Sequence, residues 1–418
     1  YSIRSKIPKK ILIVGSGTGN DTAYALERGV SHIDAVEIDP AIIHIGKKYH
    51  PQRPYQSKKV NVIQNDARNF IQHTKNKYDL IVYGMLDSHS SLSGRGGIRL
   101  DSYVYTVESF REARKTLTDD GYLSLSFNLS EAPLGLKIYA MLTEAFDGKE
   151  PLVISHFKQS IDNFKMQPYA FLIGKNIDKN FKIENPDVNQ VTFFGNKSEL
   201  SKIDISTDNW PFFYMPKKIW PKSYIFIIFL IFLSSFFLIN RTNPINKSNF
   251  SPVCFFLGAG FMLVETKGIT ELALVYGSTW FVVSIVIACV LIMAYLANLL
   301  VINNTKIKLW LIYTFIFFTI ILGYLFTLID HGTLSPVLQK ILTPTMLTLP
   351  MFFSGMAFSK QLSTEKAISI ALSSNILGAI FGGLLEYNAM YFGYRSLYVL
   401  GFAMYLSAFI FSKKRFIN

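Results

Sequence analysis

A glycine-rich turn near the start of the chain constrains the fold more than any other feature. Residues 11–19 read ILIVGSGTG, so four apolar residues run into three glycines at alternate positions. The apolar run suits a buried parallel strand, and the glycines allow a tight turn in which the backbone approaches a ligand closely. A helix from about Asn20 would point its free N–H groups at that turn. The next apolar run ends in Glu37, whose carboxylate can accept both hydroxyls of a ribose. This layout predicts a βαβ unit that binds a nucleoside-containing ligand.

The first half of the chain continues this alternation of strand-like and helix-like segments. Strands are expected at residues 11–14, 33–37, 60–64, 80–83, 122–127, 152–156 and 170–173, the last two as an antiparallel pair. Helices are expected at residues 21–28, 41–49, 66–73, 106–115 and 136–146. The alternation predicts an α/β Rossmann-like doubly wound sheet. Ligands of such sheets bind at the carboxyl ends of the strands. One cleft is therefore expected to contain the glycine turn, Glu37, Asp66 and residues 84–89.

The spacing of the glycines separates the possible ligands. A dinucleotide site has Gly-x-Gly-x-x-Gly, whereas this chain has Gly-x-Gly-x-Gly and no Gly-Lys-Ser/Thr of a nucleotide-triphosphate loop. The run resembles the class I S-adenosylmethionine-dependent transferases, whose ligand carries no pyrophosphate. The resemblance implies that the cofactor-binding residues are Gly15, Gly17, Gly19, Glu37, Asp39, Asp66 and Ala67. A nicotinamide-binding domain with an unusual turn and a purely structural βαβ unit are the alternatives.

The second half of the chain is a series of long apolar segments. They cover residues 223–240, 250–276, 280–302, 309–329, 341–358, 367–385 and 397–411. A membrane-spanning helix needs ~20 mostly apolar residues, and core helices of a soluble protein would be shorter and amphipathic. We therefore expect a transferase-type domain at 1–174, a linker with a Trp-Pro-Phe-Phe-Tyr motif at 175–221, and an all-α transmembrane bundle of six or seven helices at 222–418.

The net charge of +13 is explained by the membrane half of the chain and does not indicate nucleic-acid binding. Much of the excess Lys and Arg flanks the apolar segments, which is the usual arrangement beside membrane helices. Cys254 and Cys289 both lie in apolar segments, and the seven histidines show no ligand spacing. Neither a disulfide framework nor a metal site is expected.

Three charged residues interrupt the apolar segment at 250–276. Ionisable groups at membrane depth are costly and are usually paired or functional, and Lys267 and Glu271 have the spacing of an ion pair on a helix. Glycines also loosen this segment, and an even number of crossings suits the positive flanks. We expect the segment to be broken or only partly inserted, with Glu265 and Lys267 facing protein or water. The alternative is that the charges lie at the membrane interface.

Four stretches of the first half resemble the catalytic core of spermidine synthases, the aminopropyltransferases. They are the glycine turn and residues 36–39, 65–70 and 78–82. In that family an Asp-x-x-Asp motif follows the last stretch, and its first Asp accepts a proton from the attacking amine. This chain has Gly84 at the first position and Asp87 at the second, and it shows no counterpart of the family's amino-terminal β-domain. The resemblance implies an intact cofactor pocket, with weak or absent aminopropyl transfer to putrescine.

Residues 100–106, 207–214 and 261–267 are similar to the membrane-spanning spermidine synthase-like proteins of bacteria. The resemblance implies a membrane-anchored transferase that uses S-adenosylmethionine or its decarboxylated form to modify an amine or a lipid-accessible acceptor. Among the residues after the fourth expected strand, Asp87 is the candidate general base, and His89 is a second candidate. Tyr103 and Tyr105 would line the substrate side or pack in the core. The alternatives are a methyltransferase and a non-catalytic nucleoside-binding domain that regulates a transporter or channel.

The expected partners are the lipid bilayer and a small amine or lipid-accessible acceptor, without nucleic acid. A homo-oligomer is compatible with the sequence. The positive flanks favour an integral protein of the bacterial plasma membrane with a cytosolic transferase domain. A seven-span protein with that domain outside is the alternative.

Overall fold

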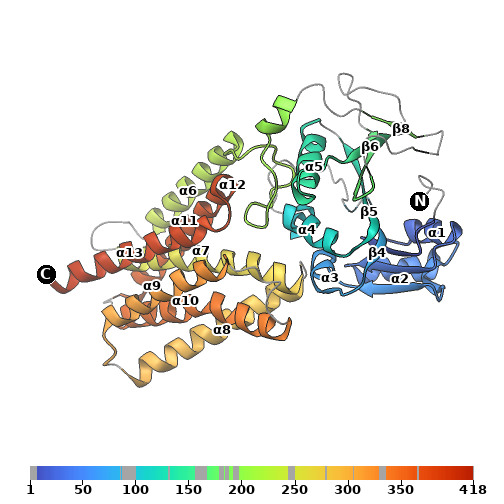
Figure 1. Cartoon of the computed structure of the whole chain (residues 1–418). Helices are drawn as coiled ribbons and strands as arrows, with labels where there is room; N and C mark the ends of the chain where they lie inside the picture. The colour runs from blue at the N-terminus through green and yellow to red at the C-terminus, as the bar shows by residue number, and fades with distance from the viewer. Residues whose placement is uncertain are drawn as a thin grey trace. The chain divides into compact units, whose positions relative to one another are not determined.

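The chain folds into two compact units, Tyr1–Lys217 and Lys218–Asn418, seen in the computed structural model of Figure 1. The structure describes residues 7–84, 86, 100–129, 132–155, 167–177, 183, 188–191, 197–242, 250–277, 280–304, 306–328, 336–364 and 367–417.

The first unit contains an eight-stranded sheet with the order β3-β2-β1-β4-β5-β7-β6-β8. Its strands are β1 (Lys10–Val14), β2 (His32–Glu37), β3 (Val60–Gln64), β4 (Tyr78–Tyr83), β5 (Leu117–Leu129), β6 (Leu152–Ser155), β7 (Gln167–Gly174) and β8 (Asn189–Gln190). The pairs β2–β3, β1–β2, β1–β4 and β4–β5 are parallel. The pairs β5–β7, β6–β7 and β6–β8 are antiparallel. The predicted Rossmann-like doubly wound sheet with an antiparallel end is confirmed.

Helices cover both faces of this sheet because alternate residues of each strand point to opposite sides. The helices are α1 (Asn20–Glu27), α2 (Pro40–Tyr49), α3 (Ala67–His73), α4 (Val107–Lys115) and α5 (Ala132–Ala145), with a short 3-10 helix, η1 (Pro54–Gln56). On β4, Ile81 and Tyr83 join the core formed with α3, α4 and α5, whereas Leu80 and Val82 join the core on the side of α1. The glycine turn after β1 and the residues after β4 thus lie at one edge of the sheet.

The segment with the Trp-Pro-Phe-Phe-Tyr motif packs into the first unit, although the sequence assigned it to a linker. The rings of Phe213 and Tyr105 stack with centroids 4.5 Å apart, and Trp210 is fully buried. The buried ammonium of Lys137 donates to the carbonyl oxygens of Phe212 and Met215, at 2.7 and 2.6 Å. These contacts offset the cost of burying the ammonium group and fix the segment against α5.

The second unit is built of helices. They are α6 (Lys222–Thr242), α7 (Pro252–Tyr276), α8 (Trp280–Asn303), α9 (Leu309–Phe326), α10 (Pro336–Thr364), α11 (Ile368–Leu385), α12 (Ala389–Phe392) and α13 (Ser396–Ile417). In the part of this unit that the structure describes, six helices are long and apolar enough to cross a membrane, and the apolar stretch Lys222–Leu238 of α6 is shorter.

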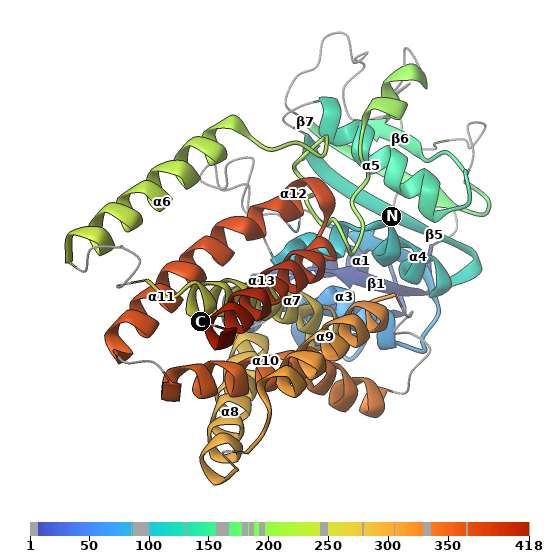
Figure 2. The same ribbon diagram turned by 90° about the vertical axis from the view of Figure 1, so that its left-hand side faces the viewer.

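The helix α7 is the centre of this unit, and it packs against α8, α10, α11 and α13 (Figure 2). Small residues allow the closest approach: a Cβ added to Gly258 would overlap Asn375 of α11, and one added to Gly378 would overlap the carbonyl of Phe255. Close backbone packing at small residues is a common way for helices to associate in membranes.

The predicted break in the segment at 250–276 is wrong, because α7 is one continuous helix of 25 residues. The prediction that Lys267 faces protein is confirmed, since its side chain is buried. Helix packing, and not a break in the backbone, accommodates the charges. Lys267 and Glu271 are buried and form an ion pair one turn apart. The hydroxyl of Thr266 donates to the Glu386 carboxylate at 3.3 Å.

Candidate active site

The turn after β1 has a backbone that only glycine adopts easily. Gly15, Gly17 and Gly19 have φ angles of +67°, +57° and +105°, a region that costs other residues roughly 1–2 kcal/mol. Space is also short at two of them. A Cβ on Gly19 would lie 2.8 Å from Pro54 Cγ, and a Cβ on Gly15 would overlap the side chain of Leu86. The backbone conformation favours glycine at all three positions, and at Gly19 the Pro54 ring adds a packing restriction.

Tyr55, on η1, fixes the shape of this turn. Its hydroxyl donates to the carbonyl oxygen of Gly17 at 2.6 Å and lies 2.8 Å from Ser16 Oγ. Because the phenol already donates to Gly17, Ser16 is the donor in the second bond. Burial raises the pKa of Tyr55 to about 12, so the phenol keeps its proton at neutral pH. The sequence reasoning did not identify this tyrosine, and nothing in the local pattern distinguishes it from a core residue.

Glu37 lies at the end of β2 with its carboxylate turned toward the glycine turn. One carboxylate oxygen accepts the N–H of Gly17 at 2.8 Å, and the other accepts the N–H of Asp39 at 3.0 Å. The side chain is buried, with 7% of its surface exposed. Each carboxylate oxygen has two acceptor positions, so each can take one further bond. This donor set fits the two adjacent hydroxyls of a ribose, and Glu37 is the residue that would hold them.

Asp39 and Asp66 both cap helices. Asp39 accepts the N–H of Ala41 at 2.7 Å at the start of α2, and Asp66 accepts the N–H of Asn69 at 2.9 Å at the start of α3. Asp66 is buried, and Ala67 is the first residue of α3. The carboxylate of Asp66 is thus held at the same sheet edge as Glu37, because β2 and β3 are parallel neighbours. Their roles in binding the adenosyl group remain predictions.

The predicted catalytic and substrate-binding residues are not seen at this cofactor site. Asp87 and His89 lie outside the described residues. Tyr103 and Tyr105 are both buried. The Tyr105 ring stacks on Phe213 and meets Phe127 edge-on at 5.9 Å. Tyr105 therefore contributes to the core on the side of α4 and α5.

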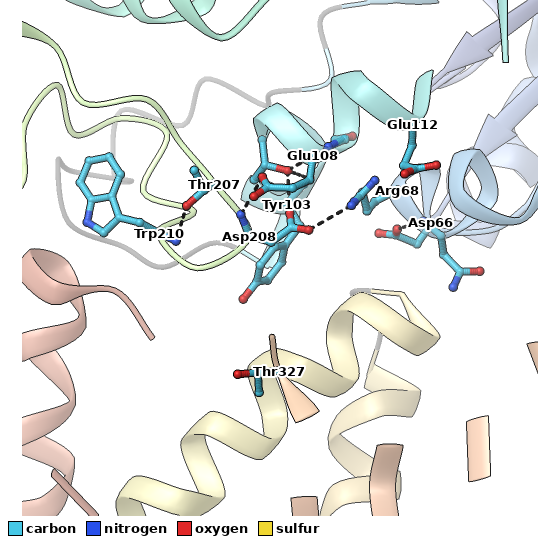
Figure 3. A network of polar contacts seen from close by, with 12 residues as sticks. Asp66, Arg68, Tyr103, Glu108, Glu112, Thr207, Asp208, Trp210 and Thr327 are labelled. Carbon is cyan, nitrogen blue, oxygen red and sulfur yellow. Dashed lines mark hydrogen bonds and ion pairs between the residues drawn. The ribbon is translucent and has the colours of Figure 1, made fainter. Parts of the chain in front are cut away.

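A largely buried polar network lies beside Asp66 (Figure 3). The guanidinium of Arg68 pairs with the Asp208 carboxylate at 3.0 Å, and the Thr106 hydroxyl donates to the same carboxylate at 2.7 Å. The N–H of Asp208 donates to the carboxylate of Glu108 at 3.0 Å. The network joins α3 to α4 and to the segment at 206–210.

Burial controls the charges of this network. It raises the pKa of the Glu108 carboxyl, and the nearby Asp208 adds to the rise. Burial lowers the pKa of Arg68, but the surrounding carboxylates, Asp208 foremost, more than reverse that effect. Arg68 and Asp208 belong to stretches that the sequence singled out, but only the fold brings them together. Arg68 is two residues from Asp66, so its bond to Asp208 suits a role in holding α3 in place.

A cavity of about 300 Å³ opens on the α1 face of the sheet, beside the end of β4. Asp21, Gly84 and residues of β5, β6 and β7 line it. A Cβ added to Gly84 would lie 2.8 Å from the Asp21 carboxylate. The sequence pattern does not distinguish Asp21, because its position in the first turn of α1 is also that of an ordinary helix-stabilising acid.

Comparison with known proteins agrees with this geometry. The family model for the spermine/spermidine synthase domain matches residues 3–132. That segment is therefore similar to a spermine/spermidine synthase domain. The chain is similar to the polyamine aminopropyltransferases of Clostridium botulinum (strain Alaska E43 / Type E3), at 31% identity over 129 residues, and Saccharolobus solfataricus, at 30% over 152 residues. The matches cover 30% and 34% of this chain, and 41% and 47% of those two proteins. The chain therefore spans less than half of the length of these relatives.

Solved structures show the same type of similarity at lower identity. The spermidine synthase from Thermotoga maritima is 18% identical, with a TM-score of 0.33, over 41% of this chain and 55% of that chain. A spermidine synthase in complex with the transition-state analogue AdoDATO is 20% identical, with a TM-score of 0.31, over 41% of this chain and 55% of that chain.

Among the described residues, no group of three His, Cys, Asp or Glu side chains is arranged to hold a metal ion.

Proposed function

We propose that this chain is a membrane-anchored aminopropyltransferase-like enzyme that transfers a group from decarboxylated S-adenosylmethionine to an amine. The observation that carries the proposal is the pairing of a buried Glu37 carboxylate with a glycine turn inside a spermine/spermidine synthase domain. Each oxygen of Glu37 has one acceptor position in addition to its backbone bond, which suits the ribose of an adenosyl ligand.

The residues of the turn would serve mainly to align the reactants. The bound sulfonium supplies an electrophilic carbon: the amine nitrogen forms a bond to that carbon, the carbon–sulfur bond breaks with its electron pair left on sulfur, and the nitrogen loses one proton. Glu37 would orient the ribose, and Tyr55 would keep the turn rigid through Gly17. Alignment of this kind can lower the barrier by about 7–11 kcal/mol.

We further propose that the second unit anchors the enzyme through six crossings, formed by α7, α8, α9, α10, α11 and α13. In this arrangement α6 does not cross the membrane, in keeping with its shorter apolar stretch. With six crossings, Lys306, Lys360 and Lys413 lie on the side from which α7 starts, as the positive-inside rule requires of a cytosolic face. The amine would then be a cytosolic or membrane-surface compound.

The full chain, solubilised in detergent, would be incubated with decarboxylated S-adenosylmethionine and a panel of 1,3-diaminopropane, putrescine and cadaverine. Formation of 5′-methylthioadenosine that depends on the amine is the expected result. The same assay with S-adenosylmethionine tests methyl transfer, since that reaction would release S-adenosylhomocysteine. Absence of both products, despite binding of 5′-methylthioadenosine, would refute a transferase and favour a nucleoside-binding regulator.

A further inference from the structure

At the end of β4, a carboxylate from another element lies beside a glycine. Gly84 follows β4 directly, and Asp21 comes from the first turn of α1. The Asp21 carboxylate would be 2.8 Å from a Cβ at position 84. Any side chain at position 84 would therefore displace the carboxylate or be displaced by it.

The cavity beside this carboxylate has the composition of a site for a small cation. Besides Asp21, its lining includes the polar side chains Ser126, Ser155 and Tyr169 and the apolar Val82 and Ile154. Among the described residues that line it, none is Lys or Arg, and Asp21 alone carries a carboxylate. A volume of about 300 Å³ is at the lower end of the ligand-pocket range, which suits a short-chain amine.

The cavity also adjoins the proposed cofactor site. Tyr83, the last residue of β4, pairs with Val14, the last residue of β1, so Gly84 lies next to Gly15. Asp21 is two residues beyond the third glycine of the turn. An amine bound by Asp21 would thus be placed beside the turn that contacts the adenosyl ligand.

We propose that Asp21 and this cavity bind the acceptor amine, with the Asp21 carboxylate bonded to the amine nitrogen and receiving its proton during transfer. The proposal rests on the proposed function for the identity of the reaction, but the amine site itself stands on the cavity. The bound ammonium first gives one proton to the Asp21 carboxylate, which frees the lone pair of the nitrogen. The nitrogen–carbon bond then forms as the carbon–sulfur bond breaks with its electron pair left on sulfur, and the proton on Asp21 passes to water.

The electrostatics of Asp21 support this role. Burial raises the pKa of its carboxyl, because the charged form loses hydration. An ammonium group in the cavity would compensate that loss, so cation binding is favoured over an empty ionised site. A raised pKa also makes the carboxylate a better proton acceptor near neutral pH.

The test compares Asp21→Asn with Asp119→Asn, which changes an exposed Asp on β5, in the full chain in detergent. We expect Asp21→Asn to lower kcat/KM for the amine by ~10²-fold or more, the range for loss of a general base. Affinity for 5′-methylthioadenosine should stay within about twofold, which shows that the domain is folded. The double variant Asp21→Ala/Gly84→Asp returns a carboxylate to the strand end and should recover part of the loss.

Two results would overturn the inference. One is wild-type amine dependence in Asp21→Asn. The other is a wild-type chain that binds neither putrescine nor cadaverine in calorimetry at millimolar concentrations. If the wild type binds an amine without turnover, and Asp21→Asn abolishes that binding, the proposed function fails while the amine site stands.

Discussion

Replacing Glu37 by Gln removes the charge of the central residue of the candidate site and keeps the size and shape of its side chain. Both carboxylate oxygens accept backbone N–H groups, at 2.8 and 3.0 Å. In the variant, one of these positions becomes an NH₂ donor that faces an N–H of Gly17 or Asp39. Leaving a buried donor without an acceptor costs about 1–3 kcal/mol, so the free energy of unfolding should fall by that amount.

The effect on ligand binding follows from the same atoms. In the proposed complex each oxygen also accepts one ribose hydroxyl, and a hydrogen bond to a charged group is worth ~1.5–3 kcal/mol. Losing one such bond and the charge should weaken binding of 5′-methylthioadenosine by ~10- to 150-fold. Glu37→Ala should weaken it further, because both bonds are lost.

Calorimetry of the full chain in detergent measures the affinity, and thermal unfolding followed by tryptophan fluorescence measures the stability. Glu27→Gln, an exposed position at the end of α1, is the matched control. Unchanged affinity in Glu37→Gln, together with the expected loss of stability, would show that the carboxylate only supports the turn. Equal affinity in Glu37→Ala would refute the assignment of the ribose site.

Three further predictions concern packing and charge. In thermal unfolding, Gly15→Ala should destabilise the chain by ~1–3 kcal/mol more than Gly17→Ala. Both positions have positive φ, but only a Cβ at position 15 would overlap the Leu86 side chain. Equal losses of stability would contradict the overlap. The pKa of Glu108 is raised in the folded chain, so the folded state holds this proton more tightly than the unfolded state. The stability of the wild type relative to Glu108→Gln should therefore fall as pH rises above 4.5. A stability difference that does not change with pH would refute this prediction. Lys267→Met should cost ~3–5 kcal/mol by leaving Glu271 buried and unpaired, and adding Glu271→Met should restore most of that; a double variant no better than the single one would show that the pair is required.

The sequence allowed the class of the fold to be predicted because its signals are local. The apolar run before Gly15, the glycines at alternate positions and the acid that ends the next strand each depend on residues within one βαβ unit. The apolar runs of the second half are likewise local, since their length and composition alone indicate membrane-crossing helices. Glu37 could be identified as a site residue for the same reason.

Only the tertiary structure decided which distant residues meet. The pair of Arg68 with Asp208 joins positions 140 residues apart, and no periodicity in a single sequence indicates such a contact. The same holds for Asp21 and Gly84, where the loss of a side chain on one element makes room for a carboxylate from another. The charges of α7 gave the wrong expectation of a broken helix, because helix packing can bury an ion pair without breaking the backbone. Local pattern thus specified the elements of this protein, whereas the packing of those elements decided which side chains share a site.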